Sequence, residues 1–104
     1  EWKHVYCTDN LNRGGKLTWT LAVNTPGVYH LEVKARGKGR VVWKAETDEG
    51  YAIQNQQGVS DIFCNRPIGW IRIDKAGTHT ITVKQLEGGA VDLSSITLVP
   101  VAFE

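Results

Sequence analysis

One stretch decides the fold of this chain: residues 17–35, LTWTLAVNTPGVYHLEVKA. Apolar residues occupy every second position in its first half, Pro26-Gly27 interrupts the pattern, and the alternation resumes from Tyr29. A period of two is the spacing of a β-strand that has one buried face and one polar face. Residues 17–35 therefore predict two strands joined by a Pro-Gly turn.

The same period continues outward along the chain. Alternating stretches cover residues 41–46, 70–74 and 80–84, and a last one runs from about Val91 to Val101. No stretch keeps the 3.6-residue period of a helix over ten or more positions. Strands with one polar face, separated by turns about every ten residues, are typical of antiparallel sandwiches and barrels. We therefore predict an all-β domain, a jelly-roll-like antiparallel β-sandwich of about eight or nine strands, with turns at 26–27, 37–39, 48–50, 76–77 and 88–89.

Two further features follow from this pattern. Leu93 and Ile96 fall out of phase across Ser94-Ser95, which predicts a bulge or bend in the last strand. The apolar positions of the strands share one face, so they should pack between the two sheets. The predicted core residues are Trp19, Tyr29, Leu31, Val33, Trp43, Ile71, Ile73, Ile81, Val83, Ile96 and Leu98.

Length and composition limit the classes of protein to which this chain can belong. Its 104 residues, 41% of them hydrophobic, suit a single domain over residues 1–104. The chain starts at Glu1 and contains no Met, so we expect a fragment of a larger multidomain protein. Its apolar runs are shorter than the roughly 18–20 residues of a membrane span. A net charge of +1 offers no basic excess for phosphates, which argues against a nucleic-acid partner.

The two cysteines, Cys7 and Cys64, lie 64 − 7 = 57 positions apart, which is not a metal-ligand spacing. A disulfide between them would close a long loop and would need Cα atoms within about 7 Å of each other. Two separate buried thiols are the alternative, because free cysteine packs as a small hydrophobe. We favour the separate thiols.

No catalytic centre is evident in the sequence. Asp48 and Glu49 are adjacent in a predicted turn, whereas glycosidase carboxylates face each other across a substrate. No local triad pattern, GxGxxG, P-loop or HExxH motif occurs. His4, His30 and His79 are dispersed, which predicts no zinc site, and His79 is in phase with the apolar side of its strand. We expect a hydrogen-bonded His79 at the core edge, no enzyme activity and no cofactor.

The segment from Tyr51 to Pro67 differs from the rest of the chain. It is polar, does not alternate cleanly, and contains consecutive amides at Gln54, Asn55, Gln56 and Gln57. Long irregular segments in small domains are usually functional or form interfaces. We therefore expect an irregular segment here that contributes to a binding surface.

Trp70 is the aromatic residue that the core pattern does not explain. It is in phase with Arg72 and Asp74, and out of phase with Ile71. Ile68 shares the predicted face of Trp70, so this face is either covered by another strand or domain, or open as a ligand platform.

Tyr51, Trp70 and the amides of residues 54–57 form the candidate binding surface. An aromatic ring can cover the apolar C–H face of a sugar while amides bind hydroxyls in the plane of the sugar ring. The same residues would also serve a protein interface, since Trp, Tyr and Arg are typical anchors. Glycan binding and docking onto another domain both remain open.

Asp92 is a weak candidate for calcium binding. It opens the last strand after Gly88-Gly89 and could supply one of the several oxygen ligands that calcium requires. An aspartate that caps the turn is the reading we prefer.

Several runs in the sequence resemble carbohydrate-binding β-sandwiches of families 6 and 35. GKLTWT at 15–20 and PGVYHLEV at 26–33 are similar to the strand, Pro-Gly turn and strand of these modules. KAGTHTITV at 75–83 and VDLSSITL at 91–98 are similar to their final two strands.

A narrower resemblance lies in the middle of the chain. VVWKAETDEG at 41–50, continuing through QNQQ at 54–57 to IGWI at 68–71, resembles the C-terminal sandwich domain of bacterial α-L-fucosidases. The resemblance implies a non-catalytic accessory module, periplasmic or secreted, whose partners are a glycan or the catalytic domain of a glycosidase. Modules of this kind often carry an acidic calcium ligand early in the chain, where only Glu1 is available here.

Overall fold

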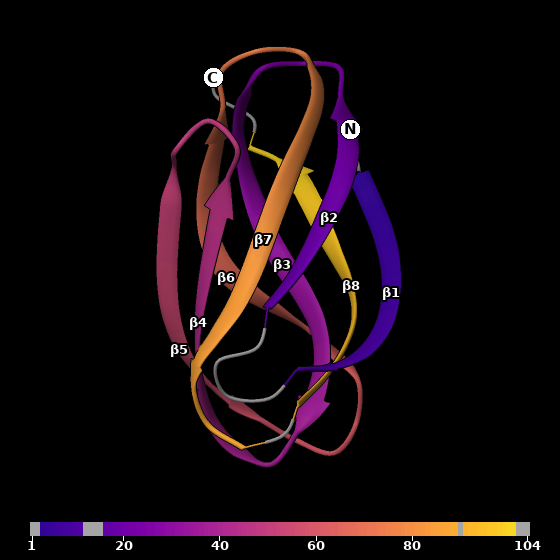
Figure 1. The fold of residues 1–104 in the computed structure, drawn as a ribbon, viewed down its shortest axis with the longest axis vertical. Coiled ribbons are helices and arrows are strands. Elements are labelled where there is room, and N and C mark those ends of the chain that lie inside the picture. Colours follow the sequence, from indigo (N-terminus) through magenta and orange to yellow (C-terminus); the bar gives the residue numbers. More distant parts are fainter. Residues whose placement is uncertain (1–2, 12–15, 90, 102–104) are drawn as a thin grey trace.

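The alternating stretches form β-strands that build two facing sheets (Figure 1). The computed structural model describes residues 3–11, 16–89 and 91–101, and for residues 3–11 and 94 it describes the backbone only. Within these ranges there is no helix, and hence none long and apolar enough to cross a membrane. The strands are β1 (Lys3–Leu11), β2 (Lys16–Val23), β3 (Gly27–Gly37), β4 (Gly39–Thr47), β5 (Ala52–Val59), β6 (Cys64–Ile73), β7 (Gly77–Glu87) and β8 (Val91–Pro100).

The strand order confirms the predicted jelly-roll-like antiparallel sandwich. Sheet A has the order β1-β8-β3-β6 and sheet B the order β2-β7-β4-β5, and every pair is antiparallel. The chain changes sheets at each connection except the β4–β5 hairpin, an alternation typical of a double-sheet jelly roll. As a result, β5 and β6 are edge strands that lie along the same side of the sandwich.

The core lies between the sheets and contains all eleven residues that the alternation predicts. Trp43 and Leu31 are fully buried, and Trp19 and Tyr29 are nearly so. The bulge predicted in the last strand is also present, because the pairing of β3 with β8 skips Ser94 between Lys34 and Ala35. This extra residue lets β8 bury both Leu93 and Ile96.

The prediction of an irregular segment from Tyr51 to Pro67 is wrong. Residues 52–59 form β5, and β6 already begins at Cys64. The pattern was hidden because β5 is an edge strand whose positions alternate between exposed and half-buried, and two half-buried positions carry the amides Asn55 and Gln57. Hydrophobicity therefore does not alternate along β5, although side-chain direction does.

The prediction that Ile68 shares the face of Trp70 is also wrong. In the β3–β6 pair, Leu31 lies opposite Gly69 and Glu32 opposite Pro67, so Ile68 is an extra, bulged residue. The bulge turns Ile68 into the core, where it is 2% exposed, and leaves Trp70 61% exposed on the outer face of sheet A. Gly69, at φ +150°, supplies a backbone conformation that other residues rarely adopt.

Cys64 is a free thiol, as favoured, but it is exposed rather than buried. It lies on β6, whereas Cys7 lies on β1 at the opposite edge of sheet A. Three strand spacings separate these edges, about 14 Å, which is too far for a disulfide. The side chain of Cys7, like Glu1 and His4, lies outside the described part of the structure.

Candidate functional site

The turns β4–β5 and β6–β7 lie at the same end of the sandwich, the upper end in Figure 1. The first turn is shaped by Thr47, whose hydroxyl oxygen accepts hydrogen bonds from the backbone N–H groups of Glu49 (3.2 Å) and Tyr51 (3.3 Å). Gly50 completes it with a positive φ of 95°. Local sequence therefore fixes the positions from which Asp48, Glu49 and Tyr51 reach toward the second turn.

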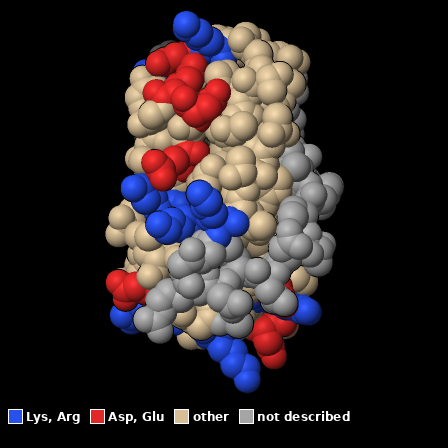
Figure 2. All heavy atoms as spheres, in the orientation of Figure 1, with Lys and Arg blue, Asp and Glu red and all other residues tan. Residues whose placement is uncertain are grey.

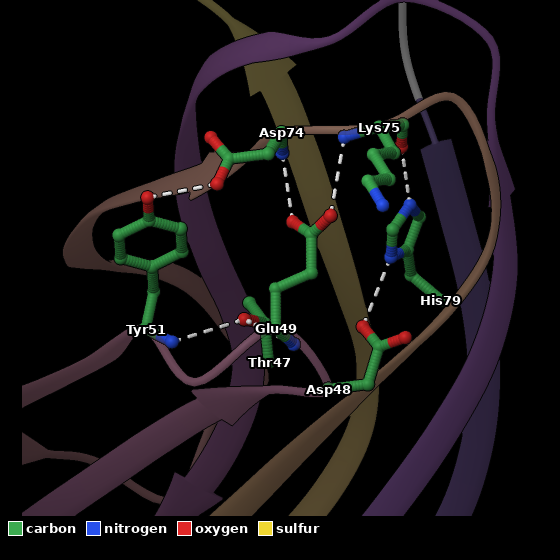
Figure 3. A network of polar contacts seen from close by, with 7 residues as sticks. All are labelled: Thr47, Asp48, Glu49, Tyr51, Asp74, Lys75 and His79. Carbon is green, nitrogen blue, oxygen red and sulfur yellow. Dashed lines mark hydrogen bonds and ion pairs between the residues drawn. The ribbon is translucent and has the colours of Figure 1, made fainter.

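Glu49 joins the two turns directly (Figure 3). Its carboxylate oxygens accept hydrogen bonds from the backbone N–H groups of Asp74 (2.7 Å) and Lys75 (3.1 Å). A second link is the Tyr51 hydroxyl, which donates to Asp74 Oδ2 at 2.9 Å. This hydrogen bond to a carboxylate is the main cause that raises the pKa of Tyr51, so the phenol remains a donor. Together, the links from Glu49 and Tyr51 hold the β4–β5 turn against the β6–β7 turn.

His79 is buried behind these turns and bonded at both ring nitrogens. Nδ1 lies 2.9 Å from Asp48 Oδ1, and Nε2 lies 2.5 Å from the carbonyl oxygen of Lys75 (Figure 3). Burial alone would lower the pKa of His79, but these two hydrogen bonds and the charges of Asp48 and Glu49 raise it. Conversely, burial alone would raise the pKa of Asp48, but the bond to His79 and its charge lower it. The predicted hydrogen-bonded histidine at the core edge is confirmed.

Between the two turns lies an open hollow of about 480 Å³, lined by Asp48, Glu49, Asp74 and residues 75–79. Its volume is within the roughly 300–1,000 Å³ of small-molecule sites. Acidic side chains gather at this end of the molecule (Figure 2). The hollow therefore offers carboxylate acceptors, together with backbone groups and the ammonium of Lys75, to a ligand that carries hydroxyl groups.

Trp70 extends this surface along the edge of the sandwich. Trp70 and Arg72 at the end of β6 and Asp74 directly after it occupy alternate positions and are all exposed. Arg72 Nη1 lies 4.0 Å from Asp74 Oδ1, and Asp74 in turn accepts the hydrogen bond from Tyr51. Four residues of strand span about 13 Å. A continuous strip thus runs from the ring of Trp70, over Arg72 and Asp74, to Tyr51 and the hollow.

The four predicted amides do not join this strip as a group. Gln54 and Gln56 are exposed on the outer face of sheet B, whereas Trp70 is on the outer face of sheet A. Gln57 points inward, accepts a hydrogen bond from Trp43 Nε1 (3.3 Å) and donates to the carbonyl of Pro67. Asn55 shares the half-buried side of Gln57. The amide of Gln57 closes the edge between β5 and β6, which is a structural role.

Sequence reasoning missed Glu49, Lys75 and His79 as members of one cluster with Tyr51 and Asp74. Glu49 and Asp74 are 25 positions apart, and only the crossing between sheets brings their turns together. The clue available in the sequence was that residues 48–50 and 76–77 are both predicted turns, each of which directly follows a strand.

Asp92, the weak calcium candidate, pairs with a cation of the protein itself. Its Oδ2 accepts a hydrogen bond from Arg36 Nε at 2.8 Å. Among the described residues, no group of three or more His, Cys, Asp and Glu side chains is arranged to hold a metal ion.

No known protein family and no curated protein matches this sequence. Solved structures do match its fold. The GH26-CBM35 β-(1,4)-mannanase of Podospora anserina has 23% identity and a TM-score of 0.72 over 88% of this chain. The carbohydrate-binding module CBM6cm-2 of Cellvibrio mixtus lichenase 5A, solved with cellotriose, has 15% identity and a TM-score of 0.68. The match includes 97% of this chain and 88% of that module.

The same fold also occurs in a protein of another kind. The insecticidal δ-endotoxin Cry8Ea1 of Bacillus thuringiensis has 14% identity and a TM-score of 0.77 over 91% of this chain. The chain spans about a fifth of the mannanase (20%) and of the endotoxin (20%). At these identities the likeness establishes a β-sandwich that recurs both as a separate module and as one part of larger proteins.

Proposed function

We propose that this domain is a non-catalytic accessory module of a glycoside hydrolase and that it binds glycan at the strip from Trp70 to Tyr51. The observation that carries the proposal is the exposure of Trp70. Among the tryptophans whose side chains the structure describes, Trp19 and Trp43 are 3% and 0% exposed, whereas Trp70 is 61% exposed. A large ring left in water on a rigid strand is costly without a partner and well suited to stack on a sugar.

The chemistry of the strip supports a sugar as that partner. The ring of Trp70 would cover the C–H face of a pyranose, and Arg72 and Asp74 beside it can donate to and accept from hydroxyls. Tyr51 and the hollow would contact the neighbouring sugar units. Gln54 and Gln56 project from the other face of the sandwich, so the acidic and basic side chains replace them as the proposed hydroxyl ligands.

The fold neighbours support the same class of function. The lichenase module was solved with cellotriose, and the mannanase contains a CBM35 part. The resemblance of the middle run to bacterial α-L-fucosidases is the basis for proposing that enzyme as the parent and a periplasmic or secreted location.

A docking domain without sugar affinity is the second candidate. It is favoured by a further exposed apolar side chain, Ile62 at 67% exposure in the β5–β6 turn. In this case Trp70 would anchor the domain on a catalytic domain, since tryptophan is a typical anchor of protein interfaces.

A glycan array on the 104-residue chain, followed by calorimetry on the strongest hit, tests the proposal. We expect Trp70→Ala and Tyr51→Ala to weaken binding at least tenfold, because stacked aromatic side chains dominate such surfaces. Gln56→Ala, on the opposite face, is the matched control and should bind as the unmodified chain does. Binding of a neutral glycan should change little with salt, since sugar hydroxyls carry no charge.

Affinity that survives both aromatic substitutions would show that the strip is not the site. If no glycan on the array binds, yet Trp70→Ala releases the domain from a fucosidase catalytic domain, the docking function is correct instead.

A further inference from the structure

Three lysines form a row across the outer face of sheet B. Lys16 on β2 lies directly opposite Lys84 on β7, and Lys84 lies directly opposite Lys44 on β4. Residues opposite each other in an antiparallel pair have Cβ atoms about 4.5–5.5 Å apart. Figure 2, which shows the face formed by sheet B, has a group of basic side chains near its middle. The row is thus a compact line of three positive charges on adjacent strands.

Such a row opposes folding, because like charges directly opposite each other in a sheet destabilise the pair. It does not result from a generally basic chain, since the net charge is only +1. The nearest carboxylate in register is Glu46, whose Oε1 lies 3.9 Å from Lys44 Nζ. On the other side of the row, Glu87 lies opposite Val42. Among the residues whose side chains the structure describes, this loosely held carboxylate is the one acid that forms an ion pair with the row.

A hollow of about 340 Å³ adjoins the row. It is lined by Lys16, Lys84, Thr80 and Thr82 together with Glu46, Thr47 and Asp48. Asp48 is already bonded to His79, and the hydroxyl of Thr82 lies 2.9 Å from that of Thr18. The hollow thus places two ammonium groups beside a patch of threonine hydroxyls, which can donate to or accept from a sugar.

We propose that the lysine row binds the carboxylate or sulfate groups of an anionic glycan. This inference rests on the proposed function and names a second surface and a ligand class for it. The row lies on sheet B, whereas Trp70 lies on the outer face of sheet A, so the two surfaces can be tested independently. Ammonium groups bind such anions as point charges, and hydroxyls beside them favour a charged sugar over a simple ion.

The test compares three polymers by calorimetry at about 20 mM and 200 mM salt. Polygalacturonate carries carboxylates, dextran sulfate carries sulfates, and dextran is neutral. We expect at least one anionic polymer to bind, and its affinity to fall severalfold at the higher salt because the lysines are exposed. Lys84→Gln should weaken this binding about tenfold. Lys38→Gln, in the β3–β4 turn, removes the same charge away from the row and should have little effect.

A stability measurement separates binding from folding. Because Lys84→Gln relieves like-charge repulsion, its unfolding midpoint in low salt should equal or exceed that of the unmodified chain, even as anionic binding is lost. Equal loss in Lys84→Gln and Lys38→Gln would mean attraction by overall charge, and would overturn the proposal. So would failure of both anionic polymers to bind, or equally tight binding of single-stranded DNA. None of these outcomes depends on Trp70→Ala, which tests the neutral-glycan strip.

Discussion

His79 makes the stability of this domain depend on pH, and the direction follows from its two contacts. Both ring nitrogens face acceptors, Asp48 Oδ1 and the Lys75 carbonyl, so only the protonated imidazolium can donate to both. Although burial alone would lower it, these bonds raise the pKa of His79 above its ordinary value of 6.5. The stabilisation is therefore complete below about pH 6.5 and is lost as pH rises through the pKa of the folded state.

The size of the effect follows from what deprotonation removes. The ring is only 5% exposed, so water cannot replace a lost hydrogen bond easily. A hydrogen bond to a charged group contributes about 1.5–3 kcal/mol. We expect His79→Gln to lower the free energy of unfolding by about that amount at pH 6, and by clearly less at pH 9.

Urea unfolding at several pH values, followed by tryptophan fluorescence, measures this difference. His30→Gln is the control, because His30 is half-buried on the outer face of sheet A and the carboxylate of Glu32 is 3.9 Å from its Nδ1. On the acid side, the bond to His79 lowers the pKa of Asp48 below 3.8 against the effect of burial, so its contribution persists until pH falls through that lowered value. Parallel stability curves for the unmodified chain and His79→Gln between pH 6 and 9 would refute the reasoning.

Two further predictions concern packing. Trp19→Ala should lower the free energy of unfolding by about 3–5 kcal/mol, because Trp19 is 3% exposed. Trp70→Ala should lower it by less than half as much, because Trp70 is 61% exposed. Similar losses for the two variants in urea unfolding would contradict the burial pattern. Gly88→Ala should cost roughly 2 kcal/mol or more, because its φ is +121° and a Cβ would lie 2.7 Å from Val41 Cγ1 and 2.8 Å from the Arg40 carbonyl oxygen. Gly89→Ala, which meets nothing within 4 Å, should stay within about 0.5 kcal/mol, and equal losses at the two glycines would disprove the clash.

The fold could be predicted for those strands in which apolar, buried positions alternate with polar, exposed ones along the sequence. Residues 17–35 alternate strictly because each strand has one face on the core, and this pattern locates strands and core without knowledge of their partners. β5 was not predicted as a strand because its inner positions include Asn55 and Gln57. The amide of Gln57 forms hydrogen bonds with Trp43 and Pro67 on other strands. Polar residues can fill half-buried edge positions when neighbours supply their hydrogen bonds, and hydropathy does not reveal this.

The candidate site could be predicted only in its aromatic part. Tyr51 and Trp70 stand out by type and phase, but Glu49, Asp74 and His79 join the site through contacts across 23 to 31 positions of sequence. Those contacts depend on which turns the jelly roll brings to one end, and a single sequence gives no pairing information at that range. The lysine row is a similar case, because Lys16, Lys44 and Lys84 become neighbours only through strand register.

The bulge at Ile68 links the fold to the proposed site. In a regular strand Ile68 would lie two positions from Trp70 on the same outer face, where apolar contact would cover part of the ring. The extra residue turns Ile68 inward to 2% exposure, and Gly69 then presents no side chain beside the ring. The Cβ that Gly69 lacks would stand 3.4 Å from Ile53 Cδ1, so the position faces β5 and adds nothing to the outer surface. One inserted residue thus adds an isoleucine to the core and keeps it off the face on which Trp70 is exposed.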